Sequence, residues 1–182
     1  SESYPCTLTL DKTGPNLTLS TLPDGSYTNQ PTLTMSGSVT DVISGIKSLT
    51  VNGESVAILP DGQFVFNAAL TSGSNSMMTI AEDCAGNRTI DTRTIILDMT
   101  APVTTASPNG GIYLSPQRVT LSTSEMATVY YTLDGTPPTL GSLVYSNGPI
   151  AIDASSTLRF FAVDAAGNVE SPKQEEYVID RV

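Results

Sequence analysis

A short motif that occurs twice constrains the fold of this chain more than any other feature. The segment Asp83–Asn87 reads DCAGN, and Asp164–Asn168 repeats it as DAAGN. Each copy is followed by a strand-like run that ends in aspartate, at Asp98 and Asp180, and a third such run ends at Asp11. The spacings are 98 − 11 = 87 and 180 − 98 = 82 residues. A fixed period of this size predicts an array of small modules, which usually space, adhere or bind rather than catalyse.

The repeat divides the 182 residues into a terminal segment and two domains. We expect residues 1–11 to be the last strand and linker of a preceding module, because Cys6–Leu10 alternates like a half-buried strand. Residues 12–98 and residues 99–182 are expected to form one domain each. The chain is therefore interpreted as a fragment of a longer protein.

Turn signals between short apolar runs predict seven strands in each domain, and no stretch shows a helical period. Asn52-Gly53 between two alternating runs is the strongest of these signals and predicts a tight hairpin. Two of the expected strands span residues 55–59 and 169–179. The predicted fold class is all-β, with two tandem immunoglobulin-like (fibronectin III-like) β-sandwiches.

Composition excludes several classes of function. The chain has 18 acidic and 8 basic residues, a net charge of −10, which disfavours nucleic acid and anionic membrane surfaces as partners. No apolar stretch approaches the ~20 residues that would insert into a bilayer. Histidine is absent, which removes histidine-dependent catalysis and the usual zinc sites. No spacing forces two carboxylates into one cleft, so no enzyme is expected.

Three stretches of the second domain carry a specific resemblance. They are Gly111–Tyr113, Val129–Thr139 with its core YYTLDGTPPT, and Ser156–Asp164. Through them residues 103–180 resemble the C-terminal immunoglobulin-like domain of the chitobiase/β-hexosaminidase family. The resemblance implies a non-catalytic accessory module of the kind attached to glycosidases and found in bacterial surface proteins.

The first domain shows a second, less specific resemblance, carried by Val51–Gly53, Pro60–Phe64 and Asp83–Asn87. Through these stretches residues 12–98 resemble bacterial immunoglobulin-like repeats of the glucodextranase accessory type and of large adhesins. Neither resemblance implies catalytic residues in this chain.

The repeated DxAGN turn has two interpretations. In the first it is a hairpin turn, in which the Asp carboxylate accepts backbone N–H groups and Gly adopts a positive φ. In the second it belongs to a Ca²⁺ site, because six to eight oxygens at about 2.3–2.6 Å could converge where the chain enters each domain, with a Kd of about 10⁻⁴–10⁻³ M. The candidate ligands are Asp11, Asp83 and Asn87 in the first domain, and Asp98, Asp164 and Asn168 in the second. Turn chemistry alone suffices to explain the motif, and no cofactor other than Ca²⁺ is indicated.

The two cysteines leave alternatives open. Cys84 lies in the first DxAGN turn, and Cys6 lies five residues before Asp11, at most about 17 Å along the chain. A Cys6–Cys84 disulfide would form if residues 1–10 turned back over this turn in an oxidising compartment. The alternative is that both thiols are free.

A sugar-binding face would need exposed aromatic rings, and tryptophan is absent. Tyr113, Tyr130, Tyr131 and Tyr145 are the candidates, but Tyr130 and Tyr131 are adjacent and must point to opposite faces of a sheet. The alternative is that these tyrosine rings pack in the core of the domain, with each hydroxyl at the edge of the core.

These observations predict non-catalytic modules of a secreted or cell-surface, bacterial multidomain protein, acting as spacers or in adhesion. The alternative is an accessory module of a polysaccharide-degrading enzyme that contacts carbohydrate. The expected partners are other domains of the same longer chain, with a glycan or a cell-surface protein as further candidates.

Overall fold

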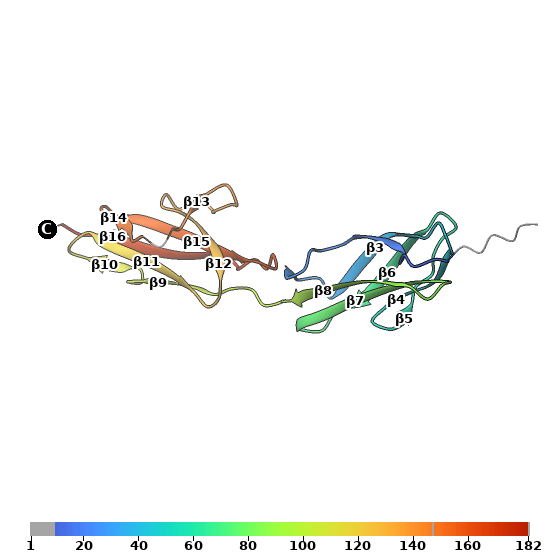
Figure 1. The fold of residues 1–182 in the computed structure, drawn as a ribbon. Coiled ribbons are helices and arrows are strands. Elements are labelled where there is room, and N and C mark those ends of the chain that lie inside the picture. Colours follow the sequence, from blue (N-terminus) through green and yellow to red (C-terminus); the bar gives the residue numbers. More distant parts are fainter. Residues whose placement is uncertain (1–9, 147, 182) are drawn as a thin grey trace, which may run out of the picture. The chain divides into compact units, whose positions relative to one another are not determined.

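The computed structural model describes residues 10–146 and 148–181. The chain forms two compact units, with unit 1 ending at Leu97 and unit 2 beginning at Asp98. The described residues of both units form strands, turns and irregular segments without a helix, and the strands of each unit build two sheets (Figure 1). The predicted fold class, two tandem all-β sandwiches, is confirmed. The expected terminal strand falls within residues 1–9, outside the described residues, and Leu10 and Asp11 are not in a strand.

Unit 1 pairs a three-stranded sheet with a five-stranded sheet, in the orders β1-β3-β6 and β2-β8-β7-β4-β5. Its strands are β1 (Asn16–Ser20), β2 (Ser26–Thr28), β3 (Thr32–Thr40), β4 (Ile46–Val51), β5 (Glu54–Ser55), β6 (Gln63–Ala69), β7 (Gly73–Asp83) and β8 (Arg88–Leu97).

Unit 2 repeats this arrangement, with sheets in the orders β14-β11-β9 and β10-β16-β15-β12-β13. Its strands are β9 (Thr104–Ser107), β10 (Gly111–Tyr113), β11 (Gln117–Thr123), β12 (Ala127–Thr132), β13 (Leu143–Val144), β14 (Ile150–Ile152), β15 (Ser156–Asp164) and β16 (Lys173–Ile179). Each strand of unit 2 has a counterpart eight positions earlier in the strand order, and in both units the short second strand runs parallel to the last strand. The period in the sequence therefore corresponds to a repeated topology.

Each unit has its own apolar core between its two sheets. In unit 1 the largest fully buried side chains include Phe64, Met35 and Leu49. In unit 2 they include Tyr177 and Phe160. Burial alternates along strands such as β3 and β11, as expected for sheets with one face on a core.

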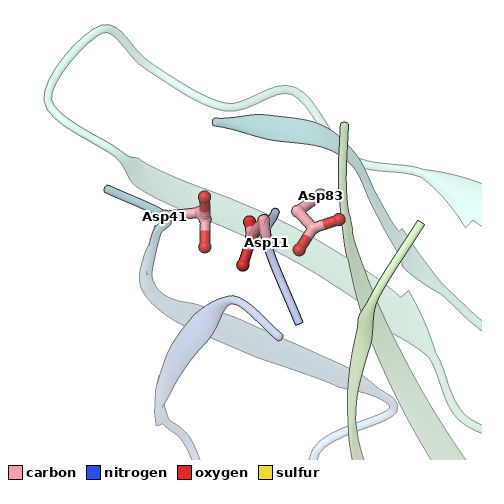
Figure 2. Close-up of side chains that lie close together, drawn as sticks. All are labelled: Asp11, Asp41 and Asp83. Carbon is pink, nitrogen blue, oxygen red and sulfur yellow. The ribbon is translucent and has the colours of Figure 1, made fainter. Parts of the chain in front are cut away.

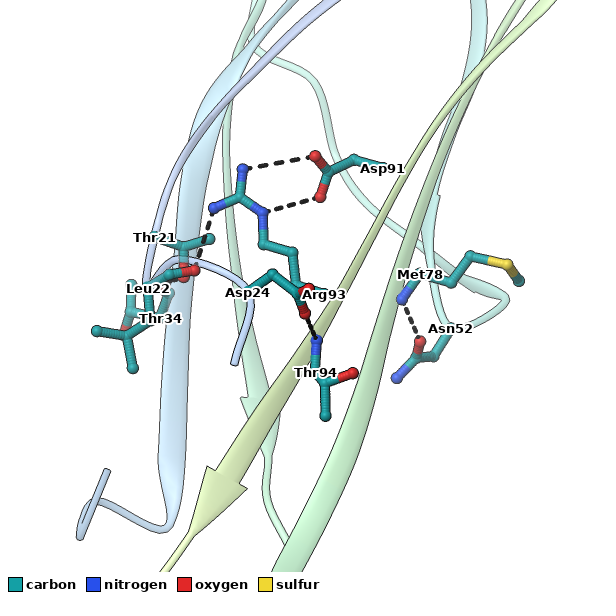
Figure 3. A network of polar contacts seen from close by, with 9 residues as sticks. All are labelled: Thr21, Leu22, Asp24, Thr34, Asn52, Met78, Asp91, Arg93 and Thr94. Carbon is teal, nitrogen blue, oxygen red and sulfur yellow. Dashed lines mark hydrogen bonds and ion pairs between the residues drawn. The ribbon is translucent and has the colours of Figure 1, made fainter. Parts of the chain in front are cut away.

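The segment before β2 is held to β8 by polar contacts that the strand pattern does not reveal (Figure 3). Arg93 donates from Nη1 to the Leu22 carbonyl at 3.1 Å and from Nε to Asp91 Oδ1 at 2.9 Å. The Thr94 N–H donates to Asp24 Oδ1 at 2.6 Å. These contacts fix the segment that crosses from the sheet of β1 to the sheet of β8. There the three-residue strand β2 pairs with residues 95–97.

The predicted hairpin at Asn52-Gly53 is present, and Asn52 (φ 49°) and Gly53 (φ 85°) both adopt the positive φ of a type I′ turn. Asn52 also accepts the Met78 N–H through Oδ1 at 2.8 Å, which fixes the turn on β7 (Figure 3).

The described residues of each unit form eight strands rather than the predicted seven, because the three-residue strands β2 and β10 were not expected, and two predicted strands differ in their bounds. The strand expected at residues 55–59 is limited to Glu54–Ser55, because Val56 and Ile58 turn into the core as the chain crosses to the other sheet. The strand expected at 169–179 begins only at Lys173, because Pro172 has no N–H for the ladder and Glu170 turns into the interior.

Candidate functional site

Strand register brings three separate segments of unit 1 to one end of the sandwich. Asn16 at the start of β1 pairs with Thr40 at the end of β3, and Ile46 at the start of β4 pairs with Asp83 at the end of β7. Asp11 precedes β1 and Asp41 follows β3, so both aspartates lie at the same end as Asp83. We call this end the N-terminal pole of unit 1.

The two DxAGN turns have nearly the same hydrogen bonds. In unit 1 the Asn87 N–H donates to Asp83 Oδ1 and the Asn87 amide donates to Asp83 Oδ2, both at 2.8 Å. Asn168 makes the same two bonds to Asp164 in unit 2, also at 2.8 Å. Gly86 has a φ of 91° and Gly167 a φ of 88°. The turn interpretation therefore accounts for the local conformation of both motifs.

Each asparagine also reaches the chain that leads into its unit. The Asn168 amide donates to the Asp98 carbonyl at 2.9 Å, and the Asn87 amide lies 3.5 Å from the Asp11 carbonyl. The structure thus places Asp11 with Asp83 and Asn87, and Asp98 with Asp164 and Asn168. Both asparagines present amide nitrogen to the carboxylates, so they act here as hydrogen-bond donors.

Three carboxylates converge at the N-terminal pole of unit 1, where Asp11 lies between Asp41 and Asp83 (Figure 2). One oxygen from each lies within 4.8 Å of the others. Asp83 is completely buried and Asp11 is 9% exposed. Asp41 was not among the residues predicted from the sequence, because its position at this pole depends on the β1–β3 register.

Neighbouring donors favour the ionised forms of two of these groups. Asp41 Oδ1 accepts the N–H groups of Ser44 at 2.7 Å, Gly45 at 2.9 Å and Ile43 at 3.1 Å. The Ser44 N–H is the main cause of the lowered pKa of Asp41. The pKa of Asp11 is lowered by the Ser44 hydroxyl and then by the Thr13 N–H, which donates to Asp11 Oδ1 at 3.0 Å.

Unit 2 has a corresponding cluster of Asp98, Glu125 and Asp164, with one oxygen of each again within 4.8 Å of the others. Here the pKa of Glu125 is raised, first by desolvation and then by the charges of Asp98 and Asp164. Glu125, like Asp41, was missed from the sequence. It lies in the loop between β11 and β12, as Asp41 lies between β3 and β4.

Cys84 is an exposed residue next to Asp83, and its N–H donates to the Gly45 carbonyl at 3.0 Å. Cys6 lies outside the described residues, so the Cys6–Cys84 disulfide stays a prediction.

Most tyrosines of unit 2 are part of its apolar core or pack against it. Tyr113 stacks on buried Tyr177 with ring centroids 6.2 Å apart, and Tyr131 and Tyr145 pack against the same core. Tyr130 points to the other side of its sheet and stacks on Phe161 at 5.4 Å. An open groove of about 540 Å³ is lined by Tyr131, Leu133, Asp134, Ser142 and Leu143, among others.

Each of the two units matches a different protein family. Residues 15–99 match the model of glucodextranase domain B, and residues 108–174 match that of the chitobiase/beta-hexosaminidase C-terminal domain. Both resemblances are confirmed. They are to immunoglobulin-like accessory domains and not to catalytic domains.

One curated relative and one solved structure extend the comparison. The chain is 40% identical over 101 residues to Bacillopeptidase F of Bacillus subtilis (strain 168), a match that covers 56% of this chain and 7% of that protein. The fold is similar to the fibronectin(III)-like modules of Clostridium thermocellum CbhA, with a TM-score of 0.55, 11% identity, and coverage of 91% of this chain and 94% of that one. The two units of the present chain therefore resemble parts of larger multidomain proteins.

In the part of the chain that the structure describes, no helix is long and apolar enough to cross a membrane.

Proposed function

We propose that this chain contributes two non-catalytic spacer modules to a longer secreted or cell-surface bacterial protein, where they hold other domains of the same chain at a distance. The observation that carries the proposal is the repeat: two sandwiches of the same topology, each with its own core and with the same DxAGN turn between its last two strands. The small part of Bacillopeptidase F that this chain matches supports a place inside a longer protein.

The spacer role is tested by replacing both modules, within the longer protein that carries them, by an unrelated tandem of β-sandwiches of equal length. We expect the neighbouring domains to keep their activity and surface display after replacement, and deletion of the modules to impair display. A replacement that abolishes binding to a specific cell or protein would show adhesion instead, because a spacer has no ligand of its own.

The alternative, a module that contacts carbohydrate, is favoured by the groove beside Tyr131 and Leu143, which combines an aromatic ring with the polar groups of Asp134 and Ser142. Retention of the chain on columns of insoluble polysaccharides, chitin included, separates the two functions. The spacer proposal predicts elution with the unretained fraction. Retention that a Tyr131→Ala variant loses would favour the carbohydrate-contacting role.

A further inference from the structure

We propose that Asp11, Asp41 and Asp83 bind a calcium ion at the N-terminal pole of unit 1, through carboxylate oxygens that converge there. The proposal concerns a site within unit 1 and does not depend on the spacer role.

Local turn chemistry explains only part of this cluster. Both oxygens of Asp83 accept hydrogen bonds from Asn87, and Asp41 Oδ1 accepts three backbone N–H groups. Asp11 Oδ1 accepts the N–H and hydroxyl of Thr13. Asp11 Oδ2 is different: it is buried and makes no hydrogen bond with any described residue, and the neighbouring Ser44 hydroxyl donates to Asp41 Oδ1 at 3.3 Å. A buried carboxylate oxygen without a donor is costly unless a cation faces it.

The geometry suits one cation. Three oxygens that lie within 4.8 Å of one another are at most about 2.8 Å from a common centre, close to the Ca–O distances of about 2.3–2.6 Å. Figure 2 shows the Asp11 carboxylate between the other two. The remaining positions of a six- to eight-coordinate ion would be filled by water and backbone carbonyls.

No basic side chain neutralises this cluster among residues 10–146 and 148–181. The ion pairs of unit 1 join Lys47 and Arg88 to Glu82, and Arg93 to Asp91. A bound cation would balance the convergent charges of the three carboxylates.

The ligand chemistry favours Ca²⁺ over other ions. The oxygens are hard carboxylate ligands, and the chain has no histidine to favour a transition metal. They come from three segments: the residues before β1, the β3–β4 loop and the β7–β8 turn. Such a set adapts more readily to the irregular shell of Ca²⁺ than to the strict octahedron of Mg²⁺.

The cluster in unit 2 does not carry the same argument. Among the described residues, none of its carboxylate oxygens is both buried and without a donor. Calcium at Asp98, Asp164 and Asn168 stays a prediction from the sequence, and this cluster serves as an internal comparison.

The site is tested by titrating the whole chain with CaCl₂ while recording the chemical shifts of its backbone amides by NMR. The amides that donate to the three carboxylates should shift most: Thr13, Ile43, Ser44, Gly45 and Asn87. We expect saturation with a Kd of about 10⁻⁴–10⁻³ M, the range of extracellular modules. Mg²⁺ should bind more weakly at the same amides.

Asp11→Asn is the decisive variant, because it keeps Oδ1 for Thr13 and replaces the oxygen that has no donor. Removing one charged ligand should weaken Ca²⁺ binding at least about tenfold, since affinity follows ligand charge. In the presence of chelator the variant should melt no lower than the parent. Asp41→Asn should also weaken binding while keeping an acceptor for its three N–H groups.

Two control variants each remove one negative charge outside the proposed site. Glu54→Gln changes an exposed strand residue of unit 1, and Glu125→Gln changes the cluster of unit 2; both should bind Ca²⁺ like the parent. The proposal is overturned if no amide shift saturates below about 10 mM, well above the stated range. It is also overturned if Asp11→Asn titrates like the parent, or if the shifts are confined to unit 2 and disappear in Glu125→Gln.

Discussion

Glu170 is buried in unit 2, and both of its carboxylate oxygens accept hydrogen bonds. Its side chain is 5% exposed and accepts the Thr104 N–H at 2.7 Å, the Thr104 hydroxyl at 2.6 Å and the Lys173 ammonium at 2.8 Å. Desolvation by burial acts to raise the pKa of Glu170, but the bonds from Lys173 and Thr104 outweigh it and lower the pKa. These contacts join the start of β9 to the segment that leads into β16.

The lowered pKa makes the stability of unit 2 depend on pH. A carboxylate whose pKa is lower in the folded state contributes stability above its unfolded pKa of about 4.3, and loses it as the pH falls through the folded pKa. We expect Glu170→Gln to reduce the free energy of unfolding at pH 7 by about 1–3 kcal/mol, the cost of an engaged charged group. Below the folded pKa the difference from the parent should shrink.

Urea unfolding followed by near-ultraviolet circular dichroism measures this effect, because five of the seven tyrosines of the chain lie in unit 2. Glu176→Gln is the control, since Glu176 is an exposed residue of β16, the strand that follows Glu170. Equal losses in the two variants at pH 7 would show that the buried contacts of Glu170 add nothing.

At the scale of the elements, Gly37 sets how closely β1 approaches β3. Leu19 is its register partner, and a Cβ atom at position 37 would lie 2.0 Å from the Thr18 carbonyl oxygen and 3.0 Å from the Phe64 ring. The Thr18 carbonyl belongs to the backbone, so the contact cannot be relieved by a change of rotamer. β1 must move away from β3 if residue 37 has a side chain.

We therefore expect Gly37→Ala to destabilise unit 1 by about 1–3 kcal/mol, the usual cost of overpacking. Hydrogen exchange of the amides of β1 and β3 should accelerate more than that of β7 and β8. Gly141→Ala is a suitable comparison, because the nearest atom to its added Cβ lies at an ordinary 3.7 Å. Unchanged exchange in β1 would contradict the close approach.

The elements also show what a sequence can predict. Strands such as β3 and β8 carry enough alternation and turn signals to be found directly. The strands β2 and β10 have three residues each and exist because tertiary contacts, such as Arg93 with Leu22, hold them beside the last strand of their sheet. Local periodicity contains no such information.

The same limit applies to the candidate site. Asp11 and Asp83 could be paired from the sequence, because the repeat relates them to Asp98 and Asp164. Asp41 and Glu125 lie in loops without a common motif, and only the register of β3 with β1 and the placement of β11 beside β9 bring each to the acidic cluster of its own unit. The burial of Asp11 Oδ2 likewise depends on packing, which residue types alone do not specify.

At the scale of the whole molecule, the two units share a topology but differ in how each satisfies its polar groups. The acidic cluster of unit 1 contains a buried carboxylate oxygen that no described residue supplies with a donor, whereas the cluster of unit 2 contains Glu125, whose pKa is raised. Unit 2 buries Glu170, whereas unit 1 buries Glu82 against Lys47 and Arg88. The repeat therefore conserves backbone connections and turns while the side-chain chemistry at the pole varies.

Because each unit has its own core, each should fold when produced alone. Unit 2 offers a sharp test of where its module begins, since the Asn168 amide donates to the Asp98 carbonyl at 2.9 Å. A fragment that begins at Asp98 should be more stable than one that begins at Ala101 by about 1 kcal/mol, the net value of one hydrogen bond. Urea unfolding followed by tyrosine circular dichroism compares the two fragments. Equal stability would place the start of the folded module after Thr100, whereas failure of both fragments to fold would show that unit 2 depends on unit 1.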